Sequence, residues 1–222
     1  MVKTTEDKGY EQRTILIYTD GCKNEHGVGS GVAIFVQQKL ALQLQFRLGI
    51  RCSNNQGEQL AIVKTLEAIE SIDIPKNSPR TIDIFTDRRI TTDLLKNANY
   101  QSYLIEEIRK RLSILDRANW TIEISWVKAH IGIYGNELAD QLSKSATRNS
   151  DIAVSFNRIP TSTLYSKLNK VVTQKWRTDR DNCTKAAITK EFFPNVRDRL
   201  KMNISINPNF MAMVTGHGRT RA

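Results

Sequence analysis

Three segments between residues 13 and 48 have the pattern of β-strands, in which apolar and polar side chains alternate with a period of two or β-branched residues cluster. The clearest case is residues 40–48, LALQLQFRL, and residues 13–19 and 28–36 show a related pattern rich in β-branched residues. Alternation with this period turns one side of a strand towards a core and the other towards water. Because Gly, Asn and Lys residues separate the first two segments, the pattern predicts an antiparallel meander of three strands.

From residue 53 onwards the apolar residues recur at intervals of three and four, which is the spacing of helices. Residues 53–69 open with Ser and Asn, residue types that favour helix N-termini, and carry apolar residues at this spacing. Similar patterns predict the remaining elements of the body: strands at 81–87 and 120–127, helices at 88–97, 102–116 and 136–146, and a loop at 128–135.

This order of elements predicts an α/β fold with a mixed five-stranded sheet, in which three antiparallel strands precede two parallel ones and helices flank the sheet. Right-handed crossovers would place the strand at 81–87 beside the strand at 13–19 and parallel to it. Each of these two segments leads into a Thr-Asp pair, which ends in Asp20 or Asp87. We therefore expect both carboxylates at the sheet edge where α/β proteins usually bind ligands.

Two further carboxylates are candidates for the same edge. Glu58 lies near the start of the helix at 53–69, and Asp140 lies on the helix at 136–146. Four carboxylates in one place repel one another unless a cation neutralises them, and Mg²⁺ accepts oxygen ligands while sharing its shell with substrate phosphate. Taken singly, each residue has an ordinary structural role: Asp20 in a turn, Glu58 as a charge favoured at a helix N-terminus, and Asp140 on a solvated helix face.

Four short motifs follow one another along the chain: YTDG at 18–21, SNNQGEQ at 53–59, FTDRR at 85–89 and WVKAHIGIYGNELADQLS at 126–143. With these motifs, residues 13–148 resemble the type 1 ribonuclease H family. They look most like the ribonuclease H domain of non-LTR (LINE-type) retrotransposon polyproteins, which also contain a reverse transcriptase. The resemblance implies a ribonuclease H-like fold. It also implies an endonuclease that hydrolyses the RNA strand of RNA/DNA hybrids with two Mg²⁺ ions, for which Mn²⁺ can substitute.

The resemblance also assigns roles to individual residues. It implies that Asp20, Glu58, Asp87 and Asp140 bind the metal ions, and that His130 assists proton transfer or product release. It further implies a set of substrate contacts, made by Gly21, Cys22, Lys23, Asn54, Asn55 and Asn136. For the three Asn residues of this set, helix capping is an alternative or additional role.

The chain departs from the family pattern at several positions. Cys22 stands where Ser is usual, and Gly57 stands where Ala or a larger residue is usual, at a cost of about 1 kcal/mol to the helix. Arg88 and Arg89 replace Ser-Gln, so that Arg88 is a candidate either for a phosphate contact or for an ion pair with Asp87. Residues 127–129 read Val-Lys-Ala in place of Val-Pro-Gly.

All four acids are retained, which favours an active enzyme over the main alternative, a hybrid-binding module without catalysis. A third interpretation, a related nuclease such as an integrase or resolvase, is disfavoured because the second acid lies on the helix directly after the third strand. The GNELAD helix at 135–140 also argues against it.

The C-terminal part is more basic than the body. Residues 1–150 contain 20 basic and 18 acidic residues, whereas residues 151–222 contain 13 and 5. This excess indicates either a polyanionic partner such as nucleic acid or simply a soluble tail. We predict a disordered terminus at 1–12, the ribonuclease H domain at 13–148, a linker at 149–162 and a basic, partly helical extension at 163–222.

Within that extension, residues 163–181 are predicted to form an amphipathic basic helix. Segments 191–200 and 214–218 resemble sequences that follow the ribonuclease H domain in the retrotransposon polyproteins, which suggests a fragment of such a polyprotein. His217 is a weak candidate for a metal ligand, because no nearby Cys completes a zinc site.

The composition excludes some other classes of protein. No apolar run approaches the roughly 18 residues of a membrane span, and the polar N-terminus lacks a signal-peptide core. Three widely spaced Cys residues suit reduced thiols better than a disulfide framework or a zinc cluster. We therefore expect an intracellular protein of the nucleus or cytoplasm, neither secreted nor membrane-bound, and a monomer.

Overall fold

A computed structural model describes residues 15–70, 80–183 and 187–217. The predicted disordered terminus at 1–12 lies outside the described residues. The chain divides into two compact units, residues 1–160 and residues 161–222.

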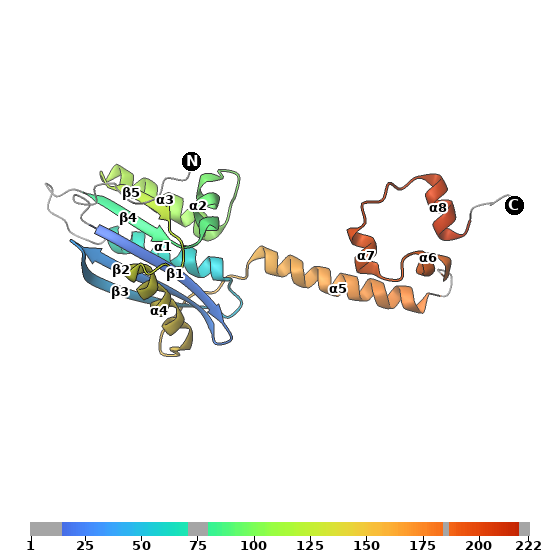
Figure 1. The fold of residues 1–222 in the computed structure, drawn as a ribbon, viewed down its shortest axis with the longest axis horizontal. Coiled ribbons are helices and arrows are strands. Elements are labelled where there is room, and N and C mark those ends of the chain that lie inside the picture. Colours follow the sequence, from blue (N-terminus) through green and yellow to red (C-terminus); the bar gives the residue numbers. More distant parts are fainter. Residues whose placement is uncertain (1–14, 71–79, 184–186, 218–222) are drawn as a thin grey trace. The chain divides into compact units, whose positions relative to one another are not determined.

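The first unit is built on one mixed sheet (Figure 1). Its strands are β1 (Ile15–Asn24), β2 (Gly27–Val36), β3 (Lys39–Leu48), β4 (Thr81–Thr86), β5 (Thr121–Trp126) and β6 (Val154–Phe156), in the spatial order β5-β4-β1-β2-β3-β6. β1, β2 and β3 form the antiparallel meander, whereas β4 pairs parallel with both β1 and β5. The predicted α/β class with a mixed sheet is confirmed, with β6 as an additional sixth strand.

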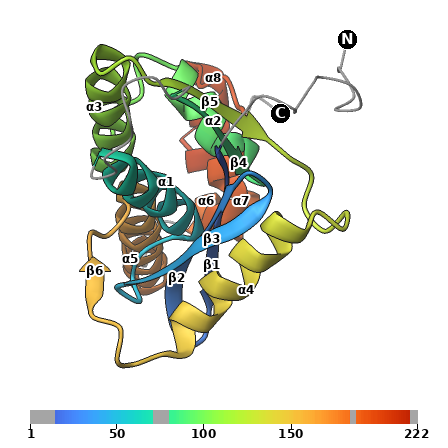
Figure 2. The same ribbon diagram turned by 90° about the vertical axis from the view of Figure 1, so that its left-hand side faces the viewer.

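Helices pack against the sheet on its two faces. They are α1 (Asn54–Glu70), α2 (Arg89–Lys96), α3 (Tyr103–Arg117) and α4 (Tyr134–Arg148). Figure 2 shows α1 and α3 on one side of the strands and α4 on the other. The strands themselves alternate between two cores: Val32 and Ile34 of β2 belong to the larger cluster with α1 and α3, and Ala33 and Phe35 to the smaller one with α4.

The segment predicted as a linker at 149–162 is partly packed onto the first unit. It contains β6, which pairs parallel with the end of β3. The Phe156 ring stacks on the Tyr103 ring with centroids 5.9 Å apart, and the Arg158 guanidinium lies 3.8 Å from the same Tyr103 ring. The N–H of Gly49 and the thiol of Cys52 both donate to the carbonyl of Phe156. The region from 149 to about 158 therefore belongs structurally to the sheet edge.

These contacts predict different stabilities for two truncated chains. A chain ending at Pro160 keeps β6 and should melt like the first unit of the full protein. A chain ending at Arg148 loses the β6 pairing and the Phe156 and Arg158 contacts, which we expect to lower the free energy of unfolding by about 2–4 kcal/mol. Urea denaturation of the two chains, followed by circular dichroism, measures the difference. Equal midpoints would mean that β6 adds nothing to the sheet.

The regular elements in the described part of the second unit are all helices. They are α5 (Thr161–Asn182), α6 (Ala187–Phe192), α7 (Val196–Lys201) and α8 (Pro208–Thr215). The predicted basic helix at 163–181 thus appears as α5, which has no buried residue. A small core forms among the shorter helices, where Val196 and Val214 are buried and the Phe193 and Phe210 rings lie 6.3 Å apart. None of the described helices is long and apolar enough to cross a membrane.

Candidate active site

Two parallel strands bring Asp20 and Asp87 to the same edge of the sheet. The parallel pairing of β1 with β4 runs as far as Thr19 opposite Thr86, and the two Asp residues follow at this point. Asp87 comes directly after the end of β4. The sequence prediction that Asp20 also ends its strand is wrong, because β1 continues to Asn24 through its pairing with β2. Asp20 instead marks the point where β1 loses β4 as a neighbour.

The start of α1 brings a third carboxylate to this edge. A capping box opens the region: the Gln56 N–H donates to Ser53 Oγ at 3.2 Å, and the Ser53 N–H donates to Gln56 Oε1 at 2.9 Å. The next turn places Glu58 completely out of solvent. Asp20, Glu58 and Asp87 each offer one oxygen such that these three atoms lie within 4.8 Å of one another. Three carboxylates from three different elements therefore converge.

Two threonines that the sequence interpretation missed hold Glu58 in place. Thr19 Oγ1 donates to Glu58 Oε1 at 3.2 Å, and the Thr86 hydroxyl donates to the same oxygen. Both threonines are fully buried and stand opposite each other in the β1–β4 register. The sequence carried a signal for them, since each is the Thr of one of the two Thr-Asp pairs at 19–20 and 86–87. The repeated pair thus supplies both carboxylates and the hydroxyl groups that orient a third one.

Burial and mutual repulsion make the charged forms of these carboxylates costly. Burial, and then the neighbouring Asp20 charge, raise the pKa of Glu58 well above its usual range. Burial also raises the pKa of Asp20, although the hydrogen bond from Ser143 opposes this, and Asp87 and Asp140 raise it further. For Asp87, burial raises the pKa, with Arg88 opposing it and Asp140 adding to it.

The unsatisfied oxygens of the group fit a hard divalent cation. Glu58 Oε2 and Asp87 Oδ1 are buried and have no hydrogen-bond partner within the described ranges. Buried acceptors of this kind are costly when left unpaired. Mg²⁺ and similar ions bind carboxylate oxygens. The site offers three carboxyl groups from three elements, whose pKa values are raised and two of which have an oxygen without a described partner. No other described group of three or more His, Cys, Asp or Glu residues is arranged in this way, so His217 has no such cluster.

Asp140 stands apart from the group of three. Its Oδ2 accepts a hydrogen bond from Lys144 Nζ at 2.6 Å, one turn further along α4. It is nevertheless close enough to raise the pKa of both Asp20 and Asp87. The structure therefore places the fourth predicted acid beside the site, with its charge matched by a lysine.

Ser143 links α4 to the site and was not anticipated from the sequence. Its hydroxyl lies 2.5 Å from Asp20 Oδ2 and is fully buried. The same hydroxyl lies 2.9 Å from the Asp140 carbonyl. One side chain thus fixes the Asp20 carboxylate against the helix that carries Asp140.

The loop between β5 and α4 places His130 near the carboxylates. His130 is exposed, adopts the left-handed backbone conformation with φ 55°, and lowers the pKa of Asp87 through its charge. Before this loop, Trp126 Nε1 donates to the backbone carbonyl of Asp87 at 2.9 Å. This contact ties the end of β5 to the backbone that carries one of the three acids.

The three Asn residues predicted as substrate contacts are not helix caps. Asn54 and Asn55 are the first two residues of α1, where Ser53 makes the capping hydrogen bond. Asn136 is the third residue of α4, whose N-cap is Ile133, so its capping interpretation is wrong. Asn54 Oδ1 and Asn136 Oδ1 are buried without a hydrogen-bond partner in the described part of the chain.

The other predicted substrate contacts have varied surroundings. Lys23 directs its ammonium group to the carbonyl of Cys52, with Nζ and O 2.5 Å apart. The pKa of the half-exposed Cys22 thiol is raised by burial and by the Asp20 charge. Arg88 acts electrostatically on Asp87 by lowering its pKa, and its Nε is buried without a partner among the described residues.

Gly21 has a packing role that the sequence interpretation did not assign. A Cβ atom built on it would lie 2.2 Å from the Glu58 backbone nitrogen and 2.9 Å from the Asn54 carbonyl oxygen. Gly57 faces it across this contact, and a Cβ there would lie 2.9 Å from the Gly29 carbonyl oxygen. The departure from the family pattern at Gly57 therefore lets α1 approach the strands closely, which brings Glu58 to the sheet edge.

The fold and the three carboxylates define an α/β protein with an acidic centre suited to a divalent cation. Comparison with known sequences then places the chain in a family: the sequence model of the RNase H family matches residues 12–148. The chain belongs to the ribonuclease H family, which is a family of enzymes.

Individual relatives agree with this assignment. The chain is 32% identical over 147 residues to a ribonuclease H of Ruthia magnifica subsp. Calyptogena magnifica, which covers 60% of this chain and 94% of that protein. It is 30% identical over 146 residues to ribonuclease H1 of Homo sapiens, covering 62% of this chain and 51% of that protein. The chain thus spans about half the length of the human relative.

Two similar solved structures each cover 60% of the chain. An RNase H1 from Halobacterium salinarum NRC-1 shares 20% identity with a TM-score of 0.46, covering 60% of this chain and 96% of that one. LC11-RNase H1, solved in complex with an RNA/DNA hybrid, shares 18% identity with a TM-score of 0.45 and covers 60% and 98%.

Proposed function

We propose that the chain is a metal-dependent endonuclease that hydrolyses the RNA strand of RNA/DNA hybrids. The observation that carries the proposal is the convergence of Asp20, Glu58 and Asp87 in a chain of the ribonuclease H family, with two buried oxygens that have no hydrogen-bond partner among the described residues. These residues would hold Mg²⁺, with Mn²⁺ as a substitute, and Asp140 would join them once released from Lys144. When bound, two such ions activate a water and stabilise the leaving oxygen of a phosphodiester.

The residues of the chain itself would orient the substrate around this centre. His130, exposed beside Asp87, is placed to carry a proton to or from solvent, a task that suits an imidazole at neutral pH. Arg88 would contact a phosphate. The backbone at 21–23 and the buried amides of Asn54 and Asn136 would read the sugar-phosphate chain, with Asn55 beside them. Recognition of 2′-hydroxyl groups, which DNA lacks, would direct cutting to RNA.

The setting of the domain is also a proposal. The resemblance of the motifs, and of segments 191–200 and 214–218, supports an origin in a non-LTR retrotransposon polyprotein, in which a reverse transcriptase would be the natural partner. We propose further that the protein acts inside the cell as a monomer. The body up to residue 148 would carry catalysis, and residues 163–222 would form the basic extension.

One observation favours a second candidate function, binding of the hybrid without efficient cutting. Lys144 Nζ lies 2.6 Å from Asp140 Oδ2, and the Arg88 charge lowers the pKa of Asp87, so that two nearby cations would compete with metal ions for these acids. A site of this kind would bind phosphate through its cations and would have a lower affinity for Mg²⁺.

The two functions are separated by cleavage of a labelled RNA/DNA hybrid with and without Mg²⁺, for the wild type and Asp20→Asn. Cutting of the RNA strand that requires Mg²⁺ and disappears in Asp20→Asn supports the nuclease. A folded wild-type protein that binds the hybrid but does not cut it in Mg²⁺ or Mn²⁺ supports the binding module. In that case Lys144→Ala is the next variant, because it frees the Asp140 carboxylate.

A further inference from the structure

The second unit contains a groove between α5 and α7 that the proposed nuclease site does not use. It is a shallow groove, widely open to solvent, with a volume of about 520 Å³. Six of its seven lining residues come from one face of α5, and Arg197 is supplied by α7. All seven are polar or aromatic, and the lining comprises Ser162, Tyr165, Ser166, Asn169, Lys170, Thr173 and Arg197.

The charged residues that line this groove are basic. Lys170 and Arg197 both line it, and none of the described lining residues is acidic. Arg177 lies about one turn beyond Thr173 on the same face of α5 and reaches Asn195, just before α7, with Nη2 and Oδ1 3.4 Å apart. Residues 161–222 contain 12 basic and 4 acidic residues, so the groove lies in a unit that attracts anions as a whole.

The remaining lining residues suit a nucleic-acid strand better than a simple anion. Ser162, Ser166 and Thr173 carry hydroxyl groups, and Asn169 an amide, all of which can bond to phosphate, sugar or base. Tyr165 leaves 63% of its surface exposed although it lies at the groove, so a ring face is available for stacking. A cationic groove with an aromatic platform is the common design of proteins that bind single strands.

We propose that this groove binds single-stranded nucleic acid, with Lys170 and Arg197 on successive phosphates and a base stacked on Tyr165. The proposal adds a second nucleic-acid ligand to the proposed nuclease function, because an enzyme that cuts hybrids meets single-stranded tails and products. It does not depend on the carboxylate site, since binding through this groove requires no divalent cation.

The test is the affinity of the full-length protein for a fluorescein-labelled 20-nucleotide oligouridylate, measured by anisotropy in EDTA at several salt concentrations. For Lys170→Ala combined with Arg197→Ala, we expect a Kd at least about 10-fold higher and a salt slope smaller by about 1.4, the value for two phosphate contacts on a single strand. For Tyr165→Ala, we expect a Kd about 5- to 100-fold higher with the slope unchanged, and Tyr165→Phe should bind like the wild type.

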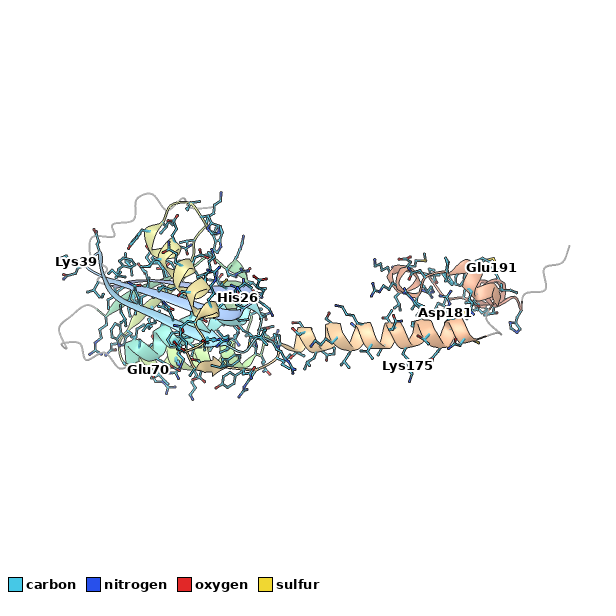
Figure 3. All side chains as sticks on the ribbon, turned by 90° about the horizontal axis from the view of Figure 1, so that it is seen from below. His26, Lys39, Glu70, Lys175, Asp181 and Glu191 are labelled. Carbon is cyan, nitrogen blue, oxygen red and sulfur yellow. The ribbon has the colours of Figure 1, made fainter. Side chains whose placement is uncertain are left out.

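The matched control removes the same charge from elsewhere on α5. Lys175 projects from the side of α5 that faces away from α7 (Figure 3), and Lys167 does not line the groove. Lys167→Ala combined with Lys175→Ala should therefore weaken binding much less than the groove variant. Equal losses in both double variants would overturn the proposal, because binding would then follow net charge alone. An unchanged Kd in Tyr165→Ala would overturn it as well.

A competition experiment separates nucleic acid from an acidic protein partner. Poly-glutamate of 20 residues should displace the oligouridylate only at a far higher concentration than unlabelled oligouridylate does. Displacement at equal concentrations would overturn the proposal in favour of a general acidic ligand. Failure of the proposed nuclease function would show separately, as a wild-type protein that does not cut a hybrid in Mg²⁺, while these binding results stand on their own.

Discussion

Glu58→Gln should abolish hybrid cleavage and at the same time stabilise the metal-free protein. Gln keeps an oxygen that accepts from Thr19 and Thr86, so the position of the side chain is preserved. It replaces the partnerless Oε2 with an amide nitrogen, which is a donor and cannot bind a metal ion. We expect cleavage to fall by about 10³-fold or more, the scale for loss of a preorganised electrostatic contact to the reacting groups.

The stability effect follows from the raised pKa of the buried carboxylates. A carboxyl whose folded pKa exceeds its unfolded value binds more protons in the folded state, so the free energy of unfolding falls as pH rises. The fall begins near the ordinary values, 3.8 for Asp20 and Asp87 and 4.5 for Glu58, and continues through the raised folded values. In EDTA the wild type should therefore lose stability from about pH 4 upwards.

Glu58→Gln removes the group with the largest of these shifts, so its stability in EDTA should fall less steeply with pH and exceed that of the wild type at pH 8. Mg²⁺ should stabilise the wild type and leave the variant nearly unchanged. Thermal denaturation of the wild type and the variant at pH 5 and pH 8, with and without Mg²⁺, measures both the pH dependence and the effect of Mg²⁺. Glu137→Gln is the matched control, because Glu137 is exposed on α4 and should respond like the wild type. A variant less stable than the wild type at pH 8 in EDTA would contradict the repulsion argument.

Much of the fold could be predicted from the sequence because local patterns determine it. Alternation over 40–48 and helical spacing over 53–69 place elements within a few residues of β3 and α1. β6 was not predicted because a strand of three residues is too short to show an alternating pattern. Its pairing with β3 also depends on where the chain leaves α4. Helix starts are equally uncertain from sequence: α4 begins two residues before Asn136, which therefore cannot be its cap.

Some features of the candidate site could likewise be predicted from the sequence, and others could not. The parallel pairing of β1 with β4 ends at Thr19 and Thr86, so that Asp20 and Asp87 follow side by side, which the order of elements predicts. The pairing of Asp140 with Lys144 could have been anticipated, since acid and base four residues apart on a helix are neighbours. The contact between Ser143 and Asp20 could not, because the two residues are 123 positions apart and meet only through the packing of α4 on β1.

Gly21→Ala should be among the most destabilising single substitutions in the first unit. The new Cβ would lie 2.2 Å from the Glu58 nitrogen, 2.7 Å from the Gly57 carbonyl carbon and 2.9 Å from the Asn54 carbonyl oxygen. All three are backbone atoms of the first turn of α1, so no side chain can move aside to make room. The helix itself has to shift, and we expect the free energy of unfolding to fall by about 3–5 kcal/mol.

This shift should also loosen the carboxylate group, because the same turn of α1 carries Glu58 towards Thr19 and Thr86. Stabilisation by Mg²⁺, measured as the rise in Tm on adding the ion, should therefore be smaller in Gly21→Ala than in the wild type. The control is Gly132→Ala, where φ is 85° and, apart from the two chain neighbours, no heavy atom of the described residues lies within 4 Å of the added Cβ. There the conformational cost of about 1–2 kcal/mol should be the whole effect. If Gly21→Ala costs no more than Gly132→Ala, the close approach of α1 to β1 is not what positions Glu58.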